Sequence, residues 1–167
     1  MITVKFETGD YLDLPIETFS GADLKGINFH RAIFEGLDFS KADFTGCDLR
    51  NSVFYFSVLN DARMMNVSLI SAILVGSKMR GVDLSGSLLM YSDFSKVDFS
   101  LASLKGANVV GGDFRDVEFS GADVSVVGLD QCNLEGASYD DETIWPENFN
   151  PEEHGLINNR RNGASEN

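Results

Sequence analysis

The chain places an apolar residue at every fifth position, without interruption, from Phe19 to Tyr139. Phe and Leu are the commonest residues at these central positions, which are called i below. The residue at i−2 is small in most units, and glycine recurs at i+2. In the unit centred on Leu24, for example, Ala22 stands at i−2 and Gly26 at i+2. An uninterrupted short period indicates that identical structural units are stacked on one another.

The direction of each side chain follows from this spacing. Residues at i−2 and i are two apart, so an extended segment points both of them inward, while i−1 and i+1 point outward. Glycine at i+2 tolerates a positive φ angle and therefore suits a corner. A period of five matches neither an α-helix nor a continuous strand. Each unit is therefore predicted to be a very short strand followed by a turn.

The phenylalanines predict how many units complete one coil. Ten central positions hold Phe, and eight of the ten fall into two adjacent classes when positions are sorted modulo 20. One class holds Phe34, Phe54, Phe94 and Phe114, and the next holds Phe19, Phe39, Phe99 and Phe119. Stacking of like rings in a close-packed interior explains this distribution. It favours a four-sided coil of 20 residues.

The flanking segments are predicted to cap the repeat, because the end units of a stack would otherwise expose apolar surface. Residues 1–13 form an N-terminal cap strand in this interpretation, since Ile2, Val4 and Phe6 alternate with polar residues. Residues 14–141 form the repeat. Residues 142–155 form a C-terminal cap, in which Ile144, Trp145 and Phe149 cover the last coil. Residues 156–167 are polar and are expected to be a flexible tail.

Several units resemble the A-(D/N)-L-x-x signature of the pentapeptide repeat family, over about residues 14–141. They include Ala22-Asp23-Leu24-Lys25-Gly26, Ala42-Asp43-Phe44-Thr45-Gly46 and Ala122-Asp123-Val124. The segment 143–151 resembles the closing T-x-W-P-x-x-F-(N/D)-P stretch of many cyanobacterial and plastid members. The resemblance implies an all-β fold, a right-handed quadrilateral β-helix with a little over six coils and short caps.

The charge of the chain restricts the classes of partner. The formal net charge is −13, and residues 110–153 hold 12 acidic residues and one basic residue. A protein that binds nucleic acid directly needs a basic face, so we expect that this acidic protein does not bind nucleic acid directly. The first residues lack the long apolar run of a signal peptide or a membrane span. We therefore expect a cytoplasmic protein without membrane contact.

Residues that could perform catalysis or bind a metal are scarce. His30 and His154 lie at opposite ends of the repeat, and no His/Cys group has metal-ligand spacing. Cys47 and Cys132 both occupy inward i−2 positions, so they are predicted to be buried thiols too far apart for a disulfide. The sequence predicts no catalytic residue, no metal and no cofactor, and hence a protein that is not an enzyme.

The clearest functional feature is a group of apolar residues at outward positions in the middle coils. Elsewhere these positions often hold Asp or Asn. Monomeric proteins generally avoid exposed apolar patches unless they are used. The patch predicts contact with another protein, or with a second copy in a homodimer, over mainly two adjacent faces. This apolar belt comprises Val53, Tyr55, Phe56, Val58, Ile70, Ile73, Val75, Leu88, Met90 and Tyr91.

A second candidate surface is acidic, and two alternative functions come with the family resemblance. Quinolone-resistance members are acidic rods that mimic DNA and protect gyrase, a type II topoisomerase. A cyanobacterial member regulates a differentiation factor by direct binding. A supercoiling assay with and without a fluoroquinolone separates the first alternative from a general interaction module. The candidate acidic residues are Asp113, Asp116, Glu118, Asp123, Asp130 and Glu135.

Overall fold

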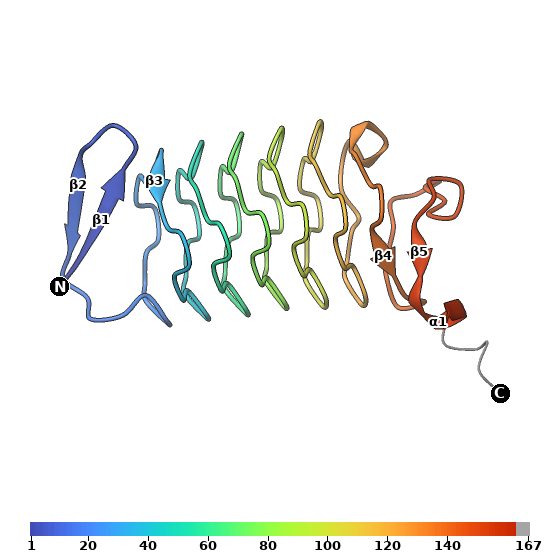
Figure 1. Ribbon diagram of the computed structural model, residues 1–167, viewed down its shortest axis with the longest axis horizontal. Helices are drawn as coiled ribbons and strands as arrows, with labels where there is room; N and C mark the ends of the chain where they lie inside the picture. Colours follow the sequence, from blue (N-terminus) through green and yellow to red (C-terminus); the bar gives the residue numbers. More distant parts are fainter. Residues whose placement is uncertain (163–167) are drawn as a thin grey trace.

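The chain forms a shaft of stacked coils, seen side-on in Figure 1. This computed structural model describes residues 1–162. Single parallel bridges join residues that are mostly 20 apart, along four ladders that start at Asp23, Asn28, Ile33 and Asp38. We call these ladders A, B, C and D in that order. The predicted four-sided arrangement of 20-residue turns is confirmed by this bridge pattern.

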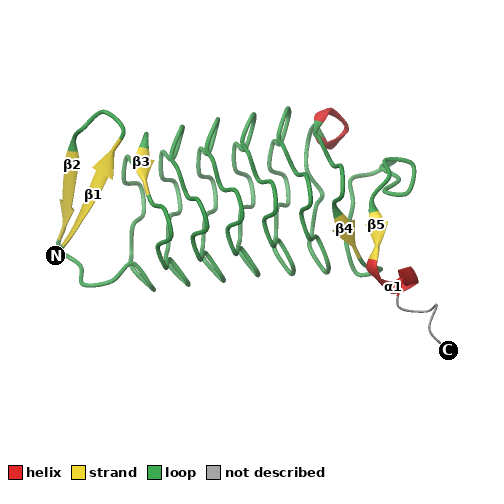
Figure 2. Ribbon diagram, in the orientation of Figure 1, coloured by secondary structure: helices red, strands yellow, loops and turns green. Residues whose placement is uncertain are grey.

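Each side of a coil is too short to count as a strand, so Figure 2 draws most of the shaft as loop. Coils are joined by backbone hydrogen bonds such as Leu24 N–H to Asp43 O, at 2.8 Å. A turn closes each unit, as in Ala22 N–H to Phe19 O at 3.0 Å. The i+2 residue takes a positive φ at nearly every corner, +65° at Gly26 for example. Short extended sides thus alternate with tight corners all along the shaft.

Stacked rings fill much of the interior. Ring centroids of residues 20 apart lie 4.6 Å apart for Phe19 and Phe39, and 4.8 Å apart for Phe34 and Phe54. All ten central phenylalanines are buried. The predicted stacking of like residues on successive coils is therefore confirmed.

Serines at the inward i−2 position are tolerated because the fold supplies an acceptor for each hydroxyl. Ser57 Oγ donates to Phe34 O at 2.5 Å, Ser77 Oγ to Phe54 O at 2.5 Å, and Ser87 Oγ to Met64 O at 2.8 Å. All three side chains are buried. A buried hydroxyl without a partner is costly, so these bonds to the preceding coil make serine compatible with the core.

The register of the repeat is broken at one corner, where the sequence shows no interruption. Val127, and not residue 128, bridges Asn108, and a 3-10 helix spans Leu129–Gln131. The expected corner residue here is Val126, which is absent from the positive-φ residues, while Gly128 has φ +86°. A β-branched side chain strongly disfavours positive φ. The corner therefore moves to the nearest glycine, and Val126 turns inward.

A hairpin caps the N-terminal end of the shaft (Figure 1). Strand β1 (Ile2–Phe6) pairs antiparallel with β2 (Tyr11–Leu14) on one side and with β3 (Ala32–Ile33) on the other. Lys5 is the residue of β1 that lies opposite both Tyr11 and Ile33, so the hairpin extends ladder C beyond the first coil. The strand at Ile2–Phe6 agrees with the alternation in the sequence, whereas β2 was not predicted.

The C-terminal cap is organised by Trp145. Its ring lies 5.8 Å from Phe119, 5.5 Å from Tyr139 and 5.2 Å from Phe149, measured between centroids. Trp145 and Phe149 thus cover the last coil, as predicted. The same prediction was wrong for Ile144, whose side chain is mainly exposed. Ile144 bridges Asp123 on ladder A, and residues at bridge positions point outward.

The residues after this cap are ordered further than the sequence indicates. Strand β4 (Ser138–Tyr139) pairs in parallel with β5 (Ile157–Asn158), and helix α1 (Asn159–Asn162) follows. Leu156 is buried against the core. The sequence predicts a flexible tail from residue 156, and the structure instead gives regular elements up to residue 162. The rest of that predicted tail, 163–167, lies outside the described residues.

Candidate protein-interaction surface

The apolar belt is centred on ladder C and on the two corners that bound it. Val53 and Ile73 bridge each other on this ladder. Ile70, Met90 and Tyr91 belong to the corner between ladders B and C. The corner between ladders C and D carries Tyr55, Phe56 and Val75, while Leu88 lies on ladder B and Val58 on ladder D. The prediction of two adjacent faces is therefore corrected: eight of the ten residues lie on ladder C and its two flanking corners, and one residue lies on each neighbouring face.

Exposure within the belt is uneven. Seven of its ten members are half-buried, and Phe56, Leu88 and Tyr91 are exposed. Phe56 and Tyr91 are each 65% exposed, more than any other belt residue. These two aromatic side chains, one on each bounding corner of ladder C, are the most accessible apolar features of the belt.

Both aromatic residues also sit in an unfavourable backbone conformation. Phe56 has φ +55° and Tyr91 has φ +58°, at corner positions where most units hold Gly or a small polar residue. A bulky residue at positive φ is uncommon and costs on the order of 1 kcal/mol or more. Each ring leans over the corner of the next coil. A Cβ atom at Gly76 would lie 2.6 Å from the Phe56 ring, and one at Gly111 would lie 2.5 Å from the Tyr91 ring.

Several exposed apolar residues lie outside the predicted belt, and two of them, Ile33 and Leu101, occupy positions like those of belt residues. Ile33 precedes Val53 on ladder C, so three successive coils present an aliphatic residue there. It was missed because the belt was assigned from Val53 onward, although its outward i−1 position gave the signal. Leu101 repeats the geometry of Phe56, with φ +60° and 57% exposure, but lies between ladders D and A, diagonally across the shaft from Tyr91.

The six candidate acidic residues do not share one face. Asp113, Glu118 and Asp123 lie on ladders C, D and A, in that order. Asp116 and Glu135 occupy the corner between ladders C and D, and Asp130 lies in the 3-10 helix. Asp113 is paired with Arg115 at 2.5 Å, and Glu118 accepts hydrogen bonds from Ser138 and Asn159. Acidic groups thus surround the C-terminal half of the shaft, and their use as a binding surface stays a prediction.

Local arginine pairs hold the pKa values of two ladder aspartates below the ordinary value of 3.8. The Arg50 side chain donates two hydrogen bonds to Asp48, and the Arg115 side chain does the same for Asp113, which lowers each carboxyl pKa. A lowered folded-state pKa contributes stability above the unfolded pKa, and that stability is lost as the pH falls through the folded value. We expect a flat melting temperature from pH 7 to about 5 and a fall below about pH 4.

Thermal unfolding of wild type and of the double variant Asp48→Asn with Asp113→Asn, followed by circular dichroism between about pH 3 and pH 7, tests this expectation. The variant cannot lose charge at these two sites, so its melting temperature should fall less steeply in acid. Identical slopes for the two proteins would contradict the assignment of this pH dependence to the two pairs.

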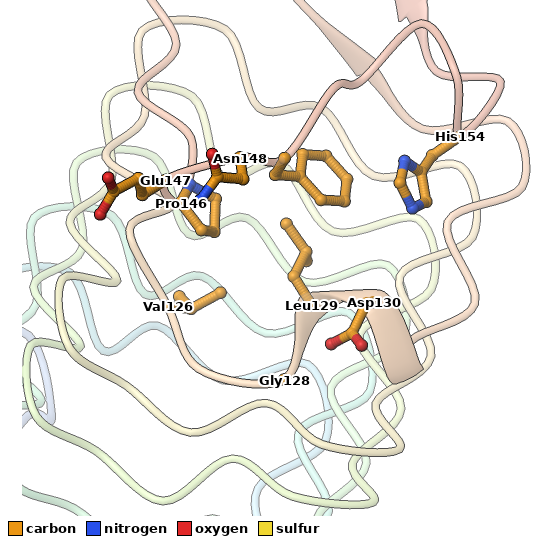
Figure 3. A pocket seen from close by; sticks show the side chains of 9 residues that line it. Val126, Gly128, Leu129, Asp130, Pro146, Glu147, Asn148 and His154 are labelled. Carbon is orange, nitrogen blue, oxygen red and sulfur yellow. The ribbon is translucent and has the colours of Figure 1, made fainter.

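A shallow pocket of about 260 Å³ lies beside the C-terminal cap (Figure 3). His154 and Glu147 lie on opposite sides of it. The His154 ring stacks on Phe149 with centroids 4.4 Å apart, and Nδ1 is 2.9 Å from Asn150 O, so the imidazole is held as part of the cap. No Ser, Thr or Cys lines the pocket. Its lining is Val126, Gly128, Leu129, Asp130, Pro146, Glu147, Asn148, Phe149 and His154.

The cysteines are free and poorly placed for chemistry. Cys47 is buried and Cys132 half-buried, and burial raises the pKa of each thiol to about 11. Cys47 Sγ donates to Leu24 O at 2.9 Å and Cys132 Sγ to Val109 O at 3.0 Å. The expected burial was wrong for Cys132, which follows the displaced corner at Gly128.

Residues 1–162 hold no group of three or more His, Cys, Asp or Glu side chains arranged to bind a metal ion. The same residues contain no helix of the length and apolarity needed to cross a bilayer.

Solved structures with similar folds include several pentapeptide repeat proteins. QnrB1, a plasmid-mediated fluoroquinolone resistance protein, is 17% identical, with 89% of this chain and 90% of that chain covered and a TM-score of 0.49. HetL, from the cyanobacterium Nostoc sp. strain PCC 7120, is 21% identical, with 76% of each chain covered and a TM-score of 0.37. Rfr23, from the cyanobacterium Cyanothece 51142, is 23% identical, with 75% of this chain and 89% of that chain covered and a TM-score of 0.33.

A comparison with curated proteins gives no match. The model of the family described as pentapeptide repeats matches in eight copies, over residues 18–51, 47–86, 88–121 and 98–136. These matches cover most of the shaft and agree with its five-residue period and four bridge ladders. The chain belongs to the pentapeptide repeat family.

Proposed function

We propose that this protein is a non-enzymatic interaction module that binds another protein through the apolar belt. The observation that carries the proposal is the placement of Phe56 and Tyr91. Both are large, 65% exposed and held at positive φ, on the two corners that bound the same face. Aromatic residues are enriched at the cores of protein interfaces, and Tyr is among the residues most enriched at their energetic centres.

The energetics of the two corners support a role in binding. Neither residue is the best choice for folding, because Gly or Asn adopts positive φ with little cost. Backbone strain of about 1–3 kcal/mol at a functional site persists where the surrounding structure enforces it. Here the backbone bonds of Phe56 N–H to Val75 O and of Tyr91 N–H to Val110 O hold the corners in place. The corner position directs both side chains outward, where a partner can reach them.

The family supports the same class of function. Pentapeptide repeat proteins are generally structural or interaction modules. In the part of the chain that the structure describes, no Ser, Thr or Cys lines the C-terminal pocket, and no group of side chains is arranged to bind a metal ion. Ladder C presents Ile33, Val53 and Ile73 on successive coils, and aromatic side chains stand on its bounding corners, an arrangement that suits contact with a protein.

The double variant Phe56→Asn with Tyr91→Asn tests the proposal. Asparagine relieves the strain at both corners, and the loss of partly buried ring surface offsets this gain, so the free energy of unfolding should change by less than about 1 kcal/mol. Capture of binding partners from native lysate by the immobilised chain should fall by about tenfold or more, a ratio set by the loss of two central aromatic contacts.

Leu101→Asn is the matched control, because Leu101 has the same corner geometry and similar exposure on a different edge of the shaft. It should capture partners as well as wild type does. Equal capture by the double variant and wild type, with both folded by circular dichroism, would show that the belt is not the contact surface.

A further inference from the structure

We infer that the belt pairs with the belt of a second copy, in an antiparallel dimer in which ladder C of one chain faces ladder C of the other. The inference rests on the proposed function and names the partner for that surface. It comes from the order of residues along the ladder, which the N-terminal hairpin extends by two positions. From the hairpin to the C-terminal half, ladder C reads Tyr11, Lys5, Ile33, Val53, Ile73, Asp93, Asp113 and Asn133.

About its midpoint, which falls between Val53 and Ile73, this series matches apolar with apolar at the centre and opposite charges at Lys5 and Asp113. A two-fold axis there, perpendicular to the shaft, would place Val53 of one copy against Ile73 of the other. The same operation places Lys5 against Asp113, whose carboxylate also pairs with Arg115 of its own chain, so opposite charges meet at both ends of the apolar centre. An isologous contact of this kind closes at two subunits and repeats each pairing twice.

The two corners beside ladder C obey the same symmetry. Arg31 lies on the corner between ladders B and C, in the same coil as Ile33. In the dimer it would meet Tyr91 of the other copy, which would place a cation over an aromatic ring. On the corner between ladders C and D, Glu35 would meet Lys96. Arg31, Glu35 and Lys96 are exposed, and none forms an ion pair within residues 1–162.

A parallel arrangement is disfavoured by the charges on the ladder. It would place each residue of ladder C against its own counterpart, so Asp93 would face Asp93 and Asp113 would face Asp113. Like charges directly opposite each other are destabilising. The antiparallel arrangement places Asp93 against Ile33, next to Lys5 on the ladder and Arg31 on the adjoining corner.

The size of the strip predicts a reversible dimer. The eight ladder positions at about 4.8 Å per step span roughly 34 Å, and a side with its corners is about 16 Å wide, which gives about 500 Å² per copy. Stable interfaces bury about 800 Å² per partner, so this contact is at the low end of the range. We expect a dissociation constant in the micromolar range.

Reversing the charges of Glu35 and Lys96 tests whether the partner is a second copy and whether the two ladders align as proposed. Glu35→Lys alone sets two cations against each other at both symmetry-related contacts, and Lys96→Glu alone sets two anions against each other there. Sedimentation equilibrium should show each single variant about tenfold or more weaker in self-association than wild type. An equimolar mixture of the two variants restores an attractive pair at both contacts, so it should form a mixed dimer with an affinity close to that of wild type.

Lys105→Glu is the control, since Lys105 lies on the corner between ladders A and B, away from the proposed contact. It should dimerise as wild type does. Wild type that stays monomeric at about 200 µM, or single variants that the mixture does not rescue, would overturn the inference. If wild type is monomeric but partner capture still depends on Phe56 and Tyr91, the dimer is wrong and the proposed function stands.

Discussion

Replacing Phe34 with alanine is expected to lower the free energy of unfolding by about 3–5 kcal/mol, the range for a fully buried phenylalanine truncated to alanine. Phe34 is completely buried, and its ring lies within 6.1 Å, centroid to centroid, of four others. These are Phe19, Phe29, Phe39 and Phe54. The neighbouring coils are tied to this one by backbone bonds, so they cannot collapse into the space left behind.

Urea denaturation of wild type, Phe34→Ala and Phe34→Leu measures this effect. Leucine should cost about 1–1.5 kcal/mol, because it keeps most of the volume and already occupies the equivalent position at Leu74. A loss below about 1 kcal/mol for alanine would mean that the ring column is not the principal packing element of the first coils.

Replacing Gly128 with alanine is the second substitution for which we expect a large loss, more than about 2 kcal/mol in the free energy of unfolding. Gly128 has φ +86°, and a Cβ atom there would clash with Val110 Cγ2 and lie 3.2 Å from the Val110 backbone. The side chain of Val110 can rotate away, but its backbone is fixed by the hydrogen bond that Tyr91 N–H donates to Val110 O.

The variant Gly106→Ala separates the cost of the steric clash from the cost of placing alanine at a positive φ angle. Gly106 has a similar φ of +71°, but no atom lies within 4 Å of the position of an added Cβ. It should therefore lose only the cost of alanine at positive φ, about 1 kcal/mol. Equal losses for the two variants in urea denaturation would show that the displaced corner at Gly128 is not tightly packed.

The sequence predicts the shaft well because every five-residue unit meets the same three physical requirements. Position i must be apolar to fill the core, i−2 must be small, and i+2 must tolerate positive φ. The stacking of Phe34 on Phe54 followed from this period alone. The displacement of the corner from Val126 to Gly128 could not be predicted from the period, because the series of central apolar residues stays intact there. The signal was present in the corner position, where valine is the only β-branched residue.

The candidate surface could be predicted only in part. Outward direction is set by position within the unit, so Val53 and Ile73 were assigned correctly to one stack. Exposure depends on how corner side chains lean over the next coil, which the period does not specify. Hence Tyr55 is half-buried while its neighbour Phe56 is largely exposed. The hydrophobic pattern also could not predict strand β2 of the hairpin or its alignment with ladder C, because the strand has only four residues.

Hydroxyl-radical footprinting of the associated protein tests most directly whether the belt is a contact surface. Oxidation rates of Phe56 and Tyr91 are compared between dilute protein and protein at associating concentration, or with a captured partner. Leu101 serves as the internal reference, because it is similarly exposed on an edge of the shaft outside the belt. We expect Phe56 and Tyr91 to become protected while Leu101 reacts at an unchanged rate. Association that leaves Phe56 and Tyr91 as reactive as in the dilute protein would contradict it.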